Sequence, residues 1–222
     1  SSTTTRERPP VPDAPQNETA PPPADPPETM PVLRAAGPLA DRSALFGEGV
    51  ALAPRPFLGR LNVRAPLPSA SMTTALEELA GREGPKLAWP LPANRWIALG
   101  PSRQLVWLGP DEMLLLGSDA EIAAAEVQIH AVMGRSPVAV TDVSDGAAAI
   151  RLSGPRAADV LAKGCPLDLE VLDSGAAVQT LLGRLDMLLL VIEGGQVYDI
   201  HVRAALAAYA WDWLADAAEE FL

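Results

Sequence analysis

The sequence predicts an α+β fold in which helices pack on a mostly antiparallel sheet. Short runs of apolar residues alternate with polar ones, as they do in half-buried strands. Glycine and proline pairs separate many of these runs at the spacing of hairpin turns, which favours antiparallel pairing. Four further segments carry helix-capping residues or the helical spacing of apolar positions. Together these patterns indicate helices packed against one face of a sheet.

The composition excludes several classes of protein. Among 222 residues, 28 are acidic and 17 are basic, for a formal charge of −11. Nucleic acids and anionic membranes both require a basic surface, so neither is expected as a partner. The longest apolar run, residues 204–211, is less than half of a membrane span, and the polar, proline-rich start lacks a secretory pattern. We therefore expect a cytoplasmic protein.

Residues 1–31 differ from the rest of the chain, because ten prolines fall among residues 9–31. Such a segment buries too little apolar surface to offset its ordering entropy, so an extended arm is expected. Two interpretations stay open: a disordered tail, or an arm that lies on a partner protein. Residues 32–222 are expected to form a single α+β domain.

The first half of that domain reads as strand, helix and meander. Residues 57–64 alternate as a half-exposed strand does. Thr74 and Glu77 have the spacing of a capping box, which predicts a short helix that begins there and ends at Gly81. Turn residues separate three further runs and predict an antiparallel meander. These strands are residues 95–99, 104–108 and 112–116.

The second half alternates helices and strands. Ser118 and Glu121 form another capping box, and the helix they begin should end at Gly134. Ser153 stands at the N-cap of a later helix, with Pro155 in its first turn. The strands expected here are residues 138–142, 147–152, 181–192 and 197–202.

The last helix should bury one apolar stripe. The residues of that stripe are Leu206, Tyr209, Ala210, Trp213, Leu214, Ala217 and Phe221. Trp211 and Trp213 lie about 200° apart around the helix axis, so one of them should face a second surface. Because tryptophan is favoured in protein interfaces, a contact role for Trp211 and ordinary partial exposure are both open.

Catalytic signatures are weak. No Gly-x-Ser-x-Gly turn occurs, Ser153 reads as a helix cap, and Cys165 is expected to pack in the core. No His-x-x-x-His or Cys-x-x-Cys spacing indicates a metal site, and the glycine-rich motifs Gly-x-Gly-x-x-Gly and Gly-x-x-x-x-Gly-Lys of phosphate-binding loops are absent. We therefore expect no catalytic, cofactor-binding or metal-binding residue on this chain.

Asp199, His201 and Arg203 lie two residues apart along one predicted strand, so their side chains share a face. An aspartate beside a histidine has the composition of an orienter and a general base. The favoured interpretation is a polar strand face that is solvated or contacts another subunit, as antiparallel sheets often show. His130 falls in the last turn of a helix, where it favours the negative end of the dipole.

Several stretches resemble the gamma subunit of heterotetrameric sarcosine oxidase. They are residues 107–112, 140–144, 150–155, 161–169 and 202–221. The resemblance implies a non-catalytic structural subunit of a four-chain flavoenzyme that oxidatively demethylates an N-methyl amino acid, with one-carbon transfer to tetrahydrofolate. It further implies that FAD, FMN, NAD, zinc and tetrahydrofolate belong to the alpha, beta and delta subunits, and that this chain binds none of them.

The order Asp-Val-Ser, strand, Ser-Gly-Pro, helix is also similar to folate-binding domains of the glycine-cleavage T-protein type. Those domains carry a catalytic aspartate in a glycine-rich loop. Here residues 183–186 pass directly into an apolar strand, and Asp186 alone is a poor substitute, which implies a shortened domain. A stand-alone folate-binding or aminomethyltransferase-like module stays an alternative, although the missing loop favours the non-catalytic subunit.

Two positions depart from the pattern of the sarcosine oxidase family. Residues 203–207 read Arg-Ala-Ala-Leu-Ala where Arg-Ser-Phe-Ala is common, and Asp145 stands where a histidine often follows Asp-Val-Ser. The gamma subunit of N-methylglutamate dehydrogenase, a relative with the same subunit plan, is a second alternative.

Overall fold

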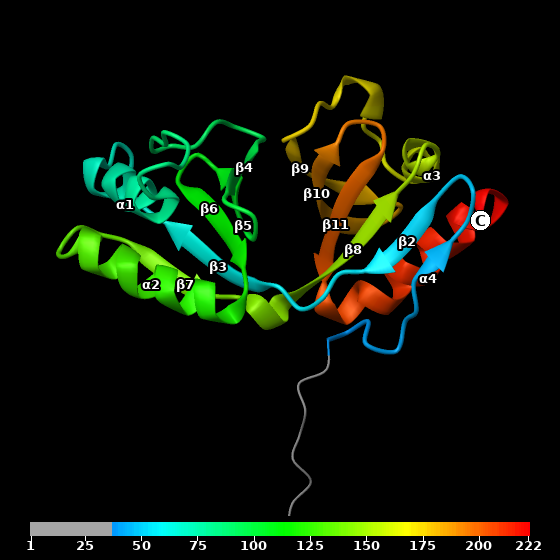
Figure 1. Cartoon of the computed structure of the whole chain (residues 1–222), viewed down its shortest axis with the longest axis horizontal. Coiled ribbons are helices and arrows are strands. Elements are labelled where there is room, and N and C mark those ends of the chain that lie inside the picture. The colour runs from blue at the N-terminus through cyan, green and yellow to red at the C-terminus, as the bar shows by residue number, and fades with distance from the viewer. Residues whose placement is uncertain (1–36) are drawn as a thin grey trace, which may run out of the picture. The chain divides into compact units, whose positions relative to one another are not determined.

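Two antiparallel β-sheets form the framework of the described chain, and four α-helices cover them (Figure 1). The structure is a computed structural model and describes residues 37–222. The arm expected over residues 1–31, and the first residues of the expected domain, lie outside the described residues. The predicted α+β class with antiparallel pairing is confirmed, although the strands divide into two sheets rather than one.

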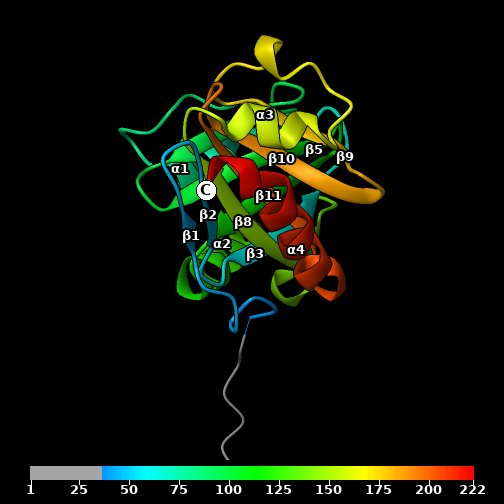
Figure 2. The same cartoon turned by 90° about the vertical axis from the view of Figure 1, so that its right-hand side faces the viewer.

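The first sheet has six strands in the order β1-β2-β8-β11-β10-β9. Their bounds are β1 Leu45–Phe46, β2 Ala51–Pro54, β8 Ala147–Ser153, β9 Ala177–Leu182, β10 Leu185–Glu193 and β11 Val197–Arg203. Figure 2 shows helices α3 (Ala157–Ala162) and α4 (Ala207–Ala218) in front of β8, β10 and β11. Together they enclose the larger apolar core, which includes Leu152, Leu189, Ile200 and Leu214.

The second sheet has five strands in the order β4-β5-β6-β3-β7. Their bounds are β3 Gly59–Arg64, β4 Trp96–Leu99, β5 Arg103–Gly109, β6 Glu112–Gly117 and β7 Ala139–Asp142. Helices α1 (Ala70–Ala80) and α2 (Asp119–Met133) pack on it around a second core that includes Leu61, Leu76, Leu115 and Ile129. Strands β4, β5 and β6 are the predicted meander.

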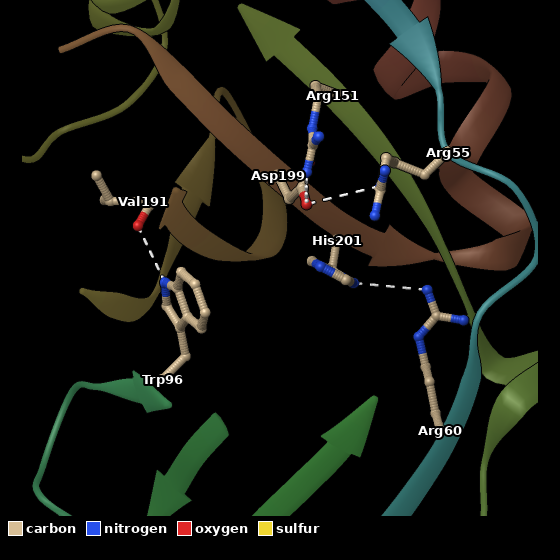
Figure 3. Close-up of polar contacts among 7 residues, drawn as sticks. All are labelled: Arg55, Arg60, Trp96, Arg151, Val191, Asp199 and His201. Atoms are coloured by element: carbon tan, nitrogen blue, oxygen red, sulfur yellow. Dashed lines mark hydrogen bonds and ion pairs between the residues drawn. The ribbon is translucent and has the colours of Figure 1, made fainter. Parts of the chain in front are cut away.

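A smaller apolar cluster joins the two sheets. Val106, Leu114 and Leu116 of the five-stranded sheet pack with Ala177 and Leu190 of the six-stranded sheet. Near this cluster, the indole Nε1 of Trp96 donates a hydrogen bond of 3.0 Å to the carbonyl oxygen of Val191 (Figure 3). The facing surfaces of the two sheets are therefore partly closed to water, so polar residues on these surfaces can be buried.

The helix caps confirm one prediction and correct another. The capping box of Ser118 and Glu121 is present in both directions, and α2 has Gly134 at its C-terminal cap. Helix α1 also ends at Gly81, but its N-cap is Ser69, whose hydroxyl accepts the backbone N–H of Met72 at 3.1 Å. The expected start at Thr74 is wrong.

The structure also corrects the expected cap at Ser153. That residue ends β8, and the N-cap of α3 is Arg156. Gly154 occupies the turn between them with a φ of 119°, and a Cβ there would lie 2.6 Å from the carbonyl oxygen of Gly49. The chain therefore uses Gly154 to leave the sheet, and the helix begins only after this turn.

The strand expected over residues 181–192 is in fact two strands. β9 ends at Leu182 and pairs antiparallel with β10, which begins at Leu185. Gly183 adopts a φ of 61° in the two-residue turn between them, a conformation that glycine reaches without strain. Apolar side chains on both sides of the turn conceal it in the sequence.

The expected buried stripe of the last helix is partly wrong. Leu206 and Tyr209 are exposed, and Trp211, which is only 4% exposed, lies in the core. The buried residues of α4 are Ala207, Ala210, Trp211, Leu214, Ala217 and Ala218. Because Trp211 is buried within the described chain, it fits neither the contact role nor the partial exposure that the sequence leaves open. Trp213 is half-buried and lies against Gly164.

Candidate functional site

Two polar residues of β11 lie buried between the sheets. Asp199 is 1% exposed and His201 is 5% exposed, whereas Arg203 at the end of the strand is exposed. The expected solvated strand face is therefore wrong for Asp199 and His201. The physical reason is the division into two sheets, because Arg60 of β3, in the second sheet, lies against His201 from the other side.

Asp199 is held by two arginines (Figure 3). Arg151 on the adjacent strand β8 donates from Nε to Oδ1 and from Nη2 to Oδ2, each at 2.7 Å. Arg55, which follows β2, places its Nε 3.7 Å from Oδ2. The hydrogen bonds to Asp199 raise the pKa of Arg151. The carboxylate therefore joins β2, β8 and β11 through charged contacts.

His201 instead faces Arg60. Its Nδ1 lies 3.5 Å from Nη2 of Arg60, a long hydrogen-bond contact. Because a guanidinium only donates, Nδ1 must accept and the ring proton must be on Nε2. Desolvation and the charge of Arg60 lower the pKa of His201 to about 3. The imidazole is thus neutral at physiological pH and a poor general base.

No hydrogen bond joins Asp199 to His201 within residues 37–222, although the two share a strand face. Both carboxylate oxygens of Asp199 accept hydrogen bonds from Arg151, and Nδ1 of His201 faces Arg60. The arrangement therefore lacks the contact by which an aspartate orients a catalytic histidine.

Arg60 is the least expected member of this cluster, because its side chain is only 3% exposed. Its Nη1 donates to the carbonyl oxygens of Leu58, at 3.0 Å, and of Ser144, at 3.2 Å. No carboxylate of the described residues forms an ion pair with it. Burial lowers the pKa of Arg60 to about 10, so the guanidinium stays charged at neutral pH.

A cavity of about 690 Å³ lies between the two sheets, next to this cluster. Arg60 and His201 line it from one side. Its apolar lining includes Leu108 and Leu114 from the five-stranded sheet and Leu188 from the six-stranded sheet. A volume of this size fits the range of small-molecule sites.

The other residues considered from the sequence lie apart from this cluster. Cys165 is buried in the larger core, as expected, and His130 is exposed in the last turn of α2, as expected. Asp186 is exposed near the start of β10 and contributes to the lining of the cavity. Ser153 is half-buried at the end of β8.

The described residues contain neither a cluster of metal ligands nor a membrane-spanning helix. Within residues 37–222, no three histidine, cysteine, aspartate or glutamate side chains lie close enough together to hold a metal ion. In the same part of the chain, no helix combines the length and the apolar character that a membrane span requires.

Sequence reasoning found Asp199 and His201 but missed Arg55, Arg60 and Arg151. Arg151 lies directly opposite Asp199 in the β8–β11 register. A cross-strand pair of opposite charges would have been a usable signal, but only once the pairing of these strands was known. Arg60 comes from the other sheet, so no local pattern places it here.

Comparison with known proteins supplies the family. The model of the "Sarcosine oxidase, gamma subunit family" matches residues 80–220. The chain belongs to this family. The gamma subunit of sarcosine oxidase from Corynebacterium sp. (strain P-1) is 34% identical over 74% of this chain and 78% of the relative. That from Corynebacterium sp. (strain U-96) is 37% identical over 53% of this chain and 57% of the relative.

Solved structures agree with this assignment. A chain of heterotetrameric sarcosine oxidase from Corynebacterium sp. U-96, in complex with pyrrole 2-carboxylate, is 29% identical with a TM-score of 0.71, over 84% of this chain and 96% of that chain. The glycine cleavage system aminomethyltransferase T from Bartonella henselae has a TM-score of 0.56 at 16% identity, over 76% of this chain and 46% of that chain. The expected likeness to the T-protein fold is thus confirmed at the level of fold.

Proposed function

We propose that this chain acts as the structural gamma subunit of a heterotetrameric sarcosine oxidase, and that the bond-making steps occur on its partner chains. The observation that carries the proposal is the match to a chain of such an assembly, with a TM-score of 0.71 over 96% of that chain. A match of that extent includes both sheets rather than a single motif, which supports a shared place in the assembly.

Exposed apolar side chains support a contact role. Val127 on α2 is 71% exposed, Phe46 on β1 is 77% exposed, and Tyr209 on α4 is 57% exposed. Large apolar and aromatic side chains of this kind are typical anchors of protein interfaces. They lie on both halves of the described chain, which favours contact with large partner subunits over a broad surface.

The proposal places the chemistry on alpha, beta and delta subunits. These would carry FAD, FMN, NAD, zinc and tetrahydrofolate and would oxidise the methyl group of sarcosine, in the cytoplasm. Molecular oxygen would accept the two electrons removed from sarcosine and be reduced to hydrogen peroxide. Glycine would be released, and the methyl carbon would pass to tetrahydrofolate. The role of this chain would be to bind its partner subunits and hold them in place.

Co-expression tests the proposal. A tagged form of this chain is produced together with the flavoprotein subunits of a heterotetrameric sarcosine oxidase, and the purified material is examined for flavin absorbance and for sarcosine-dependent oxygen consumption. We expect both to accompany the tag. Recovery of the tagged chain without partners would contradict the proposal. Oxidation of N-methylglutamate without oxygen consumption would favour the dehydrogenase relative instead.

A further inference from the structure

Arg60 has an unused hydrogen-bonding edge. Of its five N–H groups, two on Nη1 donate to backbone carbonyl oxygens and one on Nη2 makes the long contact to His201. Nε is buried and has no partner among the described residues. The N–H groups left without an acceptor thus lie on Nε and Nη2, which form the edge that binds a carboxylate with two parallel hydrogen bonds.

Arg151 shows how the same edge of a guanidinium binds a carboxylate. It uses the same two atoms, Nε and Nη2, to hold both oxygens of Asp199 at 2.7 Å. Arg60 is more deeply buried than Arg151, and no carboxylate within residues 37–222 occupies its equivalent edge. Figure 3 shows Arg60 directed toward His201, the residue with which it lines the cavity.

His201 adds a second donor without an acceptor. Its proton is on Nε2, and this atom is buried without a hydrogen-bond partner among the described residues. A buried N–H group that lacks an acceptor is destabilising.

The charge around the cavity favours an anion. Arg60 lines the cavity and forms no ion pair with a carboxylate of the described residues. Arg55 and Arg151 are half-buried, are both paired with Asp199, and do not line the cavity. Arg203 lines the cavity as a further cation, and Asp186 lines it as an anion, both of them exposed. A positive surplus therefore remains at the buried side.

We propose that this cavity binds a small organic carboxylate, with the carboxylate group beside the guanidinium of Arg60, which lacks a carboxylate partner, and the apolar body against Leu108, Leu114 and Leu188. The volume of about 690 Å³ exceeds what an inorganic anion needs, and the apolar walls favour a ligand with a hydrophobic part. All of these lining residues belong to this chain, so the proposal does not rest on the proposed function.

Equilibrium dialysis with radiolabelled benzoate tests the site, and benzamide serves as the uncharged analogue. The protein is used as purified, with its partner subunits where they co-purify. We expect one equivalent of benzoate per copy of this chain to be lost in Arg60→Gln, and benzamide to bind there at least ten-fold more weakly. Carboxylate sites on partner subunits contribute equally to every variant.

Two further variants keep the test decisive. Leu108→Trp fills the cavity without changing the buried charges, and it should lose the same equivalent even if Arg60→Gln fails to fold. Arg64→Gln alters an exposed arginine of the same strand and should bind like the wild type. Equal benzoate binding in the wild type and Leu108→Trp would overturn the proposal, as would equal affinity for benzamide. So would occupation of the edge by a carboxylate of a partner subunit.

Discussion

Asp199 is the charged residue on which the buried cluster depends most. It is almost fully buried and is the sole carboxylate paired with Arg55 and Arg151 within the described residues. Removal of one member of a buried ion pair leaves the other charge desolvated and uncompensated. Its contribution should therefore far exceed that of an exposed ion pair.

Asp199→Asn should accordingly lower the free energy of unfolding by about 3–5 kcal/mol. Pulse proteolysis in increasing urea measures this for the chain, alone or within its assembly. Asp212→Asn, which removes the exposed partner of Arg42, serves as the matched control and should cost less than about 1 kcal/mol. Equal losses in the two variants would show that burial does not control the strength of these contacts.

His201 makes stability depend on pH. Burial lowers the pKa of His201 from 6.5 to about 3, so between these values the unfolded chain binds a proton that the folded chain does not. The stabilising effect of a neutral, buried His201 is complete above about pH 6.5 and is lost as the pH falls toward 3.

From pH 7 to pH 5, His201 should thus remove about 2 kcal/mol from the free energy of unfolding. The measurement is urea unfolding by pulse proteolysis at both pH values in the wild type and in His201→Gln, which should lack this contribution. His130→Gln, at the exposed second histidine, should keep it. The same pH dependence in all three proteins would contradict a buried, neutral His201.

At the scale of the elements, the sequence predicts helix and strand types well where their signals are local. The capping box of Ser118 and Glu121 lies within four residues and identifies the start of α2. Helix α1 shows the limit of such signals, because both Ser69 and Thr74 are acceptable capping residues and only the path of the preceding chain decides between them.

The two candidate caps of α1 can be separated by substitution. Ser69→Ala should lower the free energy of unfolding by about 1 kcal/mol, because it removes the acceptor of the Met72 N–H. Thr74→Ala should cost less, since its hydroxyl donates to the carbonyl oxygen of Ala70 inside the helix. Chemical denaturation of both variants provides the measurement, and a larger loss in Thr74→Ala would contradict the observed start of the helix.

Contacts between elements were harder to predict. Trp213 lies against Gly164, where an added Cβ would approach the indole ring to 2.5 Å. The sequence predicts that one of Trp211 and Trp213 faces a second surface but does not identify Gly164 as the neighbour, because the contact exists only where α4 packs beside the end of α3. The prediction of the buried stripe of α4 is partly wrong for the same reason, because the residues that become buried depend on the surface against which the helix packs.

Gly164→Ala should therefore destabilise the chain by about 1–3 kcal/mol through overpacking. Trp213→Phe removes the ring atoms that would clash, so the cost of Gly164→Ala should fall in that background, and a double-mutant cycle measures the coupling. Gly146→Ala, where no atom lies within 4 Å of the added Cβ, is the control. Additive costs of Gly164→Ala and Trp213→Phe would argue against the contact.

At the scale of the whole described chain, the pairing of the two sheets governs the site. The sequence gives strands on which Asp199 and His201 share a face, but one antiparallel sheet would leave that face to solvent. The second sheet brings Arg60 to His201 and forms one wall of the cavity beside them. Burial of the cluster is thus a property of the tertiary arrangement, which no local pattern encodes.

We propose that this chain supplies fold and contact surface to a sarcosine oxidase assembly and that the redox cofactors belong to other chains. Native mass spectrometry of the co-expressed assembly, with stepwise dissociation of its subunits, tests this most directly. We expect a four-chain complex that contains one copy of this chain, and flavin masses that stay with other subunits. A flavin that dissociates together with this chain, or a complex that forms without this chain, would contradict this proposal.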